Sequence, residues 1–223
     1  GGDRRAGERR IVFACQRPVA NSVLPPALAG FAREHPEYEL AMVAGTLDEV
    51  LAQLRDGTAD LACFLSRWPQ EGVAGRAIGV ERFALVAAPS HPLAGRAAVP
   101  PRELARHKFV RAAHRSGFSI HMADMLRAAG IAGTPVASRA TESGMVRELT
   151  AAGVGIWCVL AKTVRQDVES GLLAELSPGG PPMTMGLWLA HDERRPLSAA
   201  ARRLADYIEA CSTVEREAPR ASS

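Results

Sequence analysis

The amino-acid sequence predicts an α/β fold with a parallel, doubly wound sheet. Two observations lead to this prediction. About 60 residues from the first strand onward follow the order strand–helix–strand–helix–strand, and a second series of strand-like and helix-like segments begins near residue 100. No internal repeat or low-complexity tract interrupts the alternation. We therefore expect β/α units whose parallel strands lie side by side.

The first β/α unit opens on a strand at 10–14 and returns to a second strand at 38–43. Between them, Pro25 and Pro26 suit the first turn of a helix, where backbone N–H groups have no helical partner. Apolar residues then recur on one face at helical spacing until Pro36 ends the helix. These features predict a helix that connects two parallel strands.

The second unit begins with a capping-box sequence. The Thr46 hydroxyl and the Glu49 carboxylate can satisfy the unpaired N–H groups of a helix start. Leucine and valine residues supply the apolar face of this helix, and Gly57 suits a left-handed stop. An apolar run at 59–64 follows as the third strand.

The second series begins after a strand at 82–88 that ends before His91-Pro92. Its elements are predicted as a short helix at 101–107, a strand at 109–110, a helix at 118–129, a strand at 135–138, a helix at 142–152 and a strand at 155–160. A long strand at 183–190 and an amphipathic helix at 197–211 complete the fold. The apolar stripe of that last helix is expected to pack on the first lobe.

Charge and hydropathy exclude several classes of protein. The net charge is +3, and residues 1–10 carry +2 of it. Nucleic-acid-binding domains usually have a clustered basic face, and the rest of the chain shows none. No apolar run suits a membrane span or the core of a signal peptide. We expect a cytoplasmic protein without a membrane partner, in which residues 1–9 are a linker or a cloning remnant.

Motifs for catalysis or metal binding are absent from the sequence. It has no G-x-S-x-G, P-loop or H-E-x-x-H motif, and the Gly153-Val154-Gly155 segment precedes a strand rather than the helix of a dinucleotide site. Four scattered cysteines fit neither a zinc site nor a disulfide framework. We expect no enzyme activity, no cofactor and buried, reduced thiols. The alternative for Cys15 and Cys63, which end neighbouring strands, is a redox switch, although nothing nearby would lower a thiol pKa.

Four segments, in this order, resemble the effector-binding domain of LysR-type transcriptional regulators. They are Leu24-Pro25-Pro26, the L-R-D-G-T-A-D-L-A segment at 54–62, His91-Pro92-Leu93-Ala94, and L-T-A-A-G-V-G-I at 149–156. The resemblance covers about 10–211 and implies a type 2 periplasmic-binding-protein-like fold, with two Rossmann-like lobes joined by two crossing strands. Lobe I would comprise 10–86 and 190–212, lobe II would comprise 87–189, and 213–223 would be a disordered tail.

The resemblance also implies a function. Such domains bind a small effector in the cleft between the lobes and control an N-terminal winged helix-turn-helix. This module is expected to be absent, because the chain starts at the first effector-domain strand, so DNA would be contacted only through the missing part. The family implies a homodimer formed through lobe I, and a tetramer of the full-length protein. Two alternatives are a solute-binding protein of the same fold and, less favoured, an enzyme on this scaffold.

Ligand contacts are predicted in the loops between strands and helices. In doubly wound sheets, ligands bind beyond the carboxyl ends of the strands, where helix N-termini can hold an anionic group. We therefore expect a small, anionic organic effector. The candidate ligand-binding residues are Gln16, Arg17, Pro18, Ser66, Arg67, Trp68, His114, Arg115, Ser116, Thr141 and Glu142.

The first loop departs from the family pattern. LysR-type domains often have Ser or Thr hydroxyls there that contact an effector carboxylate, and this chain has Gln16 and Pro18 at those places. Gln16 can donate through its amide, and Arg17 either supplies a bidentate fork or stays solvated. Arg67 and Trp68 offer a cation and an apolar wall suited to an aromatic or medium-sized acid. The alternative is that Trp68 packs on the lobe surface.

The remaining loop residues have structural roles open to them as well. Ser116 and Thr141 are of the residue types that cap helix N-termini, and ligand contact would be an additional role. His114 is either a solvated loop residue or a group that senses pH or pairs with a carboxylate. Glu142 suits the first turn of a helix, and in a ligand site it would favour an amine or a hydroxyl on the effector.

Overall fold

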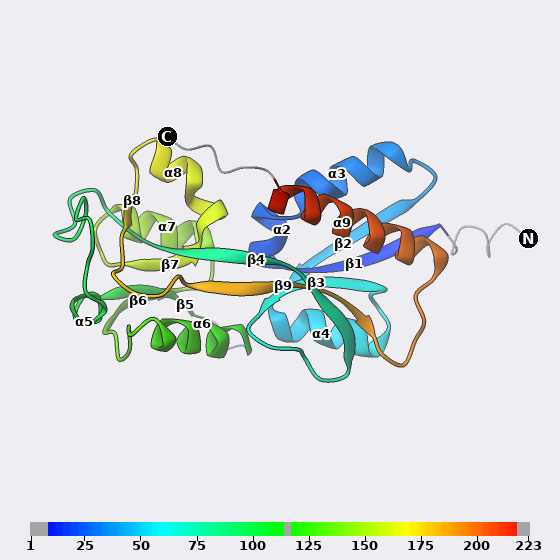
Figure 1. The fold of residues 1–223 in the computed structure, drawn as a ribbon, viewed down its shortest axis with the longest axis horizontal. Coiled ribbons are helices and arrows are strands. Elements are labelled where there is room, and N and C mark those ends of the chain that lie inside the picture. The colour runs from blue at the N-terminus through cyan, green and yellow to red at the C-terminus, as the bar shows by residue number, and fades with distance from the viewer. Residues whose placement is uncertain (1–8, 114–116, 218–223) are drawn as a thin grey trace, which may run out of the picture. The chain divides into compact units, whose positions relative to one another are not determined.

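The computed structural model describes residues 9–113 and 117–217, with side chains up to Ser212 (Figure 1). It divides the chain into two compact units. Unit 1 consists of Gly1–Val80 and Gly186–Ser223, and unit 2 of Glu81–Met185. Strand β4 (Val73–Ala87) takes the chain from unit 1 into unit 2, and β9 (Thr184–Asp192) brings it back. The predicted α/β class with two strands that pass between the lobes is confirmed.

Unit 1 is built on parallel strands with helices between them. Its elements are β1 (Arg10–Gln16), α2 (Arg17–Ser22), α3 (Pro25–Glu34), β2 (Glu39–Gly45), α4 (Leu47–Asp56), β3 (Leu61–Ser66) and α9 (Ala199–Glu217), together with parts of β4 and β9. Strand β1 pairs in parallel with both β2 and β3, and β9 joins β3 in the antiparallel sense. The predicted order of the first three strands and their parallel direction are confirmed.

Local sequence signals explain where these helices start and stop. Pro25 and Pro26 occupy the first turn of α3 as predicted. Thr46 and Glu49 form the predicted capping box of α4, and Gly57 ends that helix in the left-handed conformation at a φ of +82°. Helix α2 was not predicted, because its six residues bury only one side chain and show no helical period.

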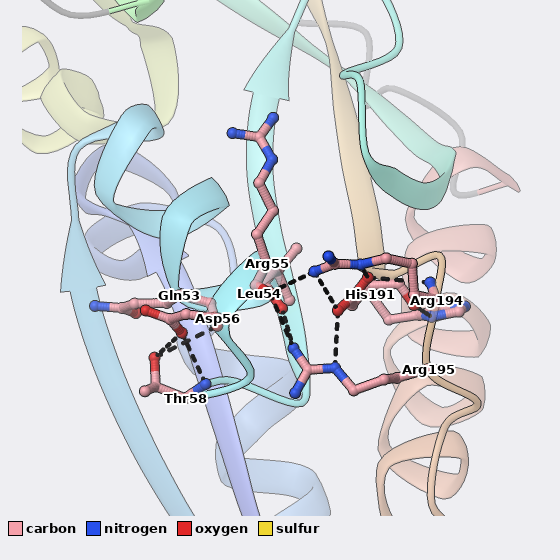
Figure 2. Close-up of polar contacts among 9 residues, drawn as sticks. Gln53, Leu54, Arg55, Asp56, Thr58, His191, Arg194 and Arg195 are labelled. Carbon is pink, nitrogen blue, oxygen red and sulfur yellow. Dashed lines mark hydrogen bonds and ion pairs between the residues drawn. The ribbon is translucent and has the colours of Figure 1, made fainter.

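A polar clamp holds the end of α4 (Figure 2). Arg195 Nη2 donates to the carbonyl oxygen of Leu54 at 2.8 Å, and Arg194 Nη2 donates to that of Arg55 at 2.6 Å. Asp192, at the end of β9, accepts from Arg194 Nε at 3.0 Å and from Arg195 Nε at 2.8 Å. These bonds, those of Arg194 foremost, hold the pKa of Asp192 below its ordinary value. Cations at a helix C-terminus also interact favourably with the helix dipole, which further stabilises α4.

Helix α9 packs against α3 and β1 of unit 1, as its apolar stripe predicted. The Tyr207 ring meets Phe31 edge-on with centroids 5.5 Å apart, and its hydroxyl donates to Glu34 at 2.7 Å. Gly30 leaves room for this hydroxyl, since a Cβ there would lie 2.5 Å from it. The helix continues to Glu217, beyond residue 212, where the predicted lobe ended.

Unit 2 has shorter elements. They are α5 (Pro101–Leu104), β5 (Phe109–Ala112), α6 (Gly117–Ala128), β6 (Val136–Ala140), α7 (Ser143–Ala151), β7 (Trp157–Leu160), the 3-10 helix η1 (Ala161–Val164), α8 (Arg165–Glu169) and β8 (Ala174–Leu176). Strand β5 pairs with β6 in parallel, and β4 pairs with β7 and β8 in the antiparallel sense. Val110, Val146 and Trp157 belong to the apolar core under α7.

Some elements of unit 2 and of the connecting strand differ from the prediction. Segments η1, α8 and β8 were missed because each has five residues or fewer and shows no period. Strand β4 starts at Val73 rather than at residue 82, because Gly75, Arg76 and Gly79 interrupt the apolar residues of its first part. Within the described ranges, no helix is both long and apolar enough to cross a membrane.

Candidate functional site

Gln16 lies at the carboxyl end of β1 and is buried. The paired register of β1 and β3 ends at Cys15 and Cys63, and the chain then turns into α2. Gln16 Oε1 accepts the backbone N–H of Leu65 at 2.9 Å, so a side chain supplies the acceptor that the strand no longer provides. The carbonyl side of the amide therefore supports β3, and its NH2 group is the donor that it can offer to a ligand.

Ser66, at the carboxyl end of β3, braces the loop that follows it. Its hydroxyl donates to the carbonyl oxygen of Trp68 at 2.5 Å and accepts from Gln70 Nε2 at 2.9 Å. The indole N–H of Trp188 donates to the Ser66 carbonyl oxygen at 3.1 Å. Ser66 is fully buried, whereas the Trp68 side chain is 44% exposed. The Trp68 ring thus lies at the surface, while the hydrogen bonds of Ser66 fix the backbone of the loop that carries it.

Two exposed arginines flank these residues in unit 1. Arg17 begins α2, and Arg67 directly follows β3. Arg17 Nη2 lies 4.0 Å from Glu49 Oε2, and that oxygen also accepts the Thr46 N–H in the capping box at 2.7 Å. A long, exposed ion pair contributes little, so the Arg17 guanidinium stays available to an anion.

Helix N-termini at this edge were expected to hold an anionic group, but the start of α4 is already occupied by acidic side chains. Its capping box and the carboxylates of Asp48 and Glu49 occupy the first turn. This turn therefore disfavours a second anion, and the positive part of the edge is the side with Arg17 and Arg67. Pro18 lies half-buried in the first turn of α2, where it can offer only an apolar surface.

The structure thus brings six of the predicted residues to one edge of unit 1. In unit 2, Thr141 and Glu142 are exposed and follow the carboxyl end of β6. The predicted N-cap role of Thr141 is wrong. Helix α7 starts at Ser143, so the cap position falls on Glu142, whose side chain makes no capping hydrogen bond. His114, Arg115 and Ser116 lie outside the described residues.

Cys15 and Cys63 lie on neighbouring strands, as predicted, although Cys63 is inside β3 rather than at its end. Cys15 and Cys63 are paired in the register of β1 and β3, and both are buried. Burial raises the pKa of the Cys15 thiol to about 12, so the reactive thiolate is scarce at neutral pH. Among the described residues, no group of three His, Cys, Asp or Glu side chains could hold a metal ion.

Arg111 and Arg139 were not among the residues predicted from the sequence. These residues are the penultimate positions of β5 and β6 and are partners in the strand register. The only signal in the sequence for this pair was an arginine near the end of each of two short strands. Their proximity depends on the pairing of the strands, which no local pattern reveals.

The sequence resembles those of known transcriptional regulators. The family model described as LysR substrate binding domain matches residues 4–212. The HTH-type transcriptional regulator CbbR of Xanthobacter flavus is 28% identical over 207 residues, covering 92% of this chain and 62% of that protein. The chain thus spans less than two thirds of that relative's length.

Solved structures share the fold at low identity. The regulatory domain of CcmR from Synechocystis PCC6803, in complex with 2-PG, has a TM-score of 0.81 and 18% identity, over 91% of this chain and 97% of that one. The effector-binding domain of BenM with its effector benzoate has a TM-score of 0.79 and 18% identity, over 95% and 96% of the two chains. At this identity the likeness concerns the fold.

Proposed function

Because this chain belongs to the LysR substrate binding domain family, we propose that it is the effector-sensing regulatory domain of a LysR-type transcriptional regulator. Its ligand is a small, anionic organic molecule, and its role is to sense that molecule rather than to catalyse a reaction. The observation that carries the choice of ligand is the pair of exposed arginines, Arg17 and Arg67, at the carboxyl edge of the parallel strands of unit 1.

The chemistry of this edge supports an acidic, partly apolar ligand. A guanidinium binds a carboxylate through two parallel hydrogen bonds, and the exposed Trp68 ring offers an apolar wall beside Arg67. The Gln16 amide can add a neutral donor. Benzoate, the effector named for BenM, combines a carboxylate with an aromatic ring and is therefore a suitable first probe.

The proposed effector contacts are those predicted from the sequence. Arg17 and Arg67 bind the acid group, Gln16 and Ser66 position it, and Trp68 contacts the apolar part. The proposed contacts in full are Gln16, Arg17, Pro18, Ser66, Arg67, Trp68, His114, Arg115, Ser116, Thr141 and Glu142. We further propose that units 1 and 2 correspond to lobes I and II.

A thermal-shift screen tests the proposal. Benzoate and other small carboxylates are added to the native chain, to an Arg17→Gln/Arg67→Gln variant and to the control Arg33→Gln, an exposed arginine at the end of α3. A carboxylate from the panel should raise the unfolding temperature of the native chain and of the control. Charge-assisted hydrogen bonds contribute about 1.5–3 kcal/mol each, so the double variant should lose most of the shift. An equal shift in all three proteins would show that these arginines do not bind the ligand.

We propose that the domain forms a homodimer through unit 1. Strand β2 lies at the edge of its sheet, with Met42 59% and Val43 41% exposed. An exposed apolar edge strand is a surface that proteins normally cover. A Met42→Glu variant should sediment as a monomer where the native chain sediments as a dimer, and two identical profiles would count against this interface.

The remaining parts of the proposal concern the full-length regulator. It would act in the cytoplasm, as a tetramer, and contact DNA through an N-terminal module rather than through this domain. Fusion of the native and the Arg17→Gln/Arg67→Gln domains to the same DNA-binding module tests this. The effector should alter operator binding only in the native fusion.

A further inference from the structure

Two arginines of unit 2 lie opposite each other on neighbouring strands. Arg111 of β5 and Arg139 of β6 are register partners in a parallel pair, so both side chains project from the same face of the sheet. Like charges directly opposite each other destabilise a sheet. Burial, and after it the charge of Arg139, lowers the pKa of Arg111. The fold therefore holds the charged Arg111 in an unfavourable environment.

The hydrogen bonding of the Arg111 guanidinium is incomplete. Its Nη2 donates to the hydroxyl of Thr134 at 2.5 Å, and the guanidinium carbon, Cζ, lies 6.0 Å from the centre of the Phe109 ring. Its Nε is buried and has no hydrogen-bond partner among the residues that the structure describes. A buried guanidinium N–H normally finds an acceptor, because its loss of water is otherwise uncompensated.

The described residues also provide no counter-charge for this pair. Within the part of the chain that the structure describes, no carboxylate pairs with Arg111 or Arg139. Other arginines of unit 2 have one: Arg82 pairs with Glu175, and Arg147 pairs with Asp167 at 2.6 Å. The contrast indicates that the described residues do not supply the partner of Arg111 and Arg139.

We propose that Arg111 and Arg139 bind a phosphate group, either free inorganic phosphate or the phosphate of an organic ligand. An oxyanion between the two guanidiniums neutralises their repulsion and supplies acceptors for their N–H donors. Phosphate fits better than a carboxylate, because it offers acceptor oxygens to two guanidinium forks at once. The site lies within unit 2, where Thr141 and Glu142 of the proposed effector contacts follow β6, and it requires neither Arg17 nor Arg67 of unit 1.

Arg139 is the residue to replace, because it is exposed and its loss leaves the Arg111–Thr134 bond in place. The proteins are the native chain, Arg139→Gln and the control Arg102→Gln, an exposed arginine of α5. Each is unfolded thermally in potassium phosphate, in glycerol 3-phosphate and in potassium chloride of equal ionic strength. Calorimetric titration with inorganic phosphate gives the affinities.

Phosphate should raise the unfolding temperature of the native chain and of Arg102→Gln above the value in chloride. Arg139→Gln should show no such rise and should bind phosphate at least about tenfold more weakly than the native chain. In chloride, Arg139→Gln should be at least as stable as the native chain, because the repulsion is gone. A rise with glycerol 3-phosphate but not with inorganic phosphate, again lost in Arg139→Gln, identifies the source as an organic ligand. Equal rises in all three proteins, or no rise above chloride with either phosphate, would overturn the proposal.

Discussion

Replacing Gln16 by leucine removes the acceptor that supports strand β3. Gln16 Oε1 is the partner of the Leu65 backbone N–H, at 2.9 Å, and both residues are buried, Leu65 completely. Leucine has a similar volume but accepts no hydrogen bond. Water cannot reach the Leu65 N–H, so this donor would be left unpaired in the core.

The expected loss follows from that single unpaired group. A buried donor without a partner costs about 1–3 kcal/mol. In a chain of this size each kcal/mol shifts the unfolding temperature by roughly 2–4 °C, so the variant should unfold about 2–12 °C below the native chain.

Urea unfolding at neutral pH provides the free energy of unfolding and the m-value for each protein. The matched control is Gln166→Leu, an exposed glutamine of α8, which should change the free energy by less than about 0.5 kcal/mol. The reasoning is refuted if Gln16→Leu is as stable as this control with an unchanged m-value, since the Leu65 N–H would then not depend on Gln16.

Three further predictions concern the scaffold and its titration. The folded-state pKa of Asp192 lies below its unfolded value, so the contribution of this carboxylate to stability is present above about pH 4 and is lost as the pH falls further. Asp192→Asn should therefore be less stable than the native chain at pH 7, and unfolding curves measured at acidic pH should show a smaller difference between the two proteins. Gly155→Ala places a Cβ 2.6 Å from the carbonyl oxygen of Lys108, and calorimetry should show a loss of about 1–3 kcal/mol, whereas Gly144→Ala, in open space, should show none. Cys15, with its pKa raised to about 12, should resist iodoacetamide at pH 8 until the protein is unfolded. Rapid alkylation of the Cys15 peptide from the native protein, measured by mass spectrometry, would contradict this, whereas alkylation of the partly exposed Cys158 and Cys211 would not.

Features that depend on neighbouring residues were predictable from the sequence. The capping box of Thr46 and Glu49, the left-handed Gly57 and the paired prolines of α3 act within one or two helical turns. The order of the strands followed from their alternation with helices, because parallel strands need a crossover between them. The resemblance to the family supplied the two strands that pass between the lobes.

Features that join distant segments were not predictable in this way. Gln16 accepts from a backbone group 49 residues away, and the clamp on α4 joins Arg195 to a carbonyl 141 positions earlier. Both contacts exist only once the strands are in register. The same holds for Arg111 and Arg139, whose opposition is a property of the β5–β6 pairing. The sequence identified Gln16, Arg17, Ser66 and Arg67 as candidates, and the structure added that Gln16 and Ser66 are buried and hydrogen-bonded to backbone groups.

Hydrogen exchange with and without ligand tests most directly the central claim that the carboxyl edge of β1 and β3 binds an anionic effector. The native chain is saturated with the carboxylate that raises its unfolding temperature most, and amide exchange is followed by mass spectrometry. We expect slower exchange at 16–22 and 65–70, the segments that carry Arg17 and Arg67. Slower exchange elsewhere, with both segments unchanged, would contradict the claim.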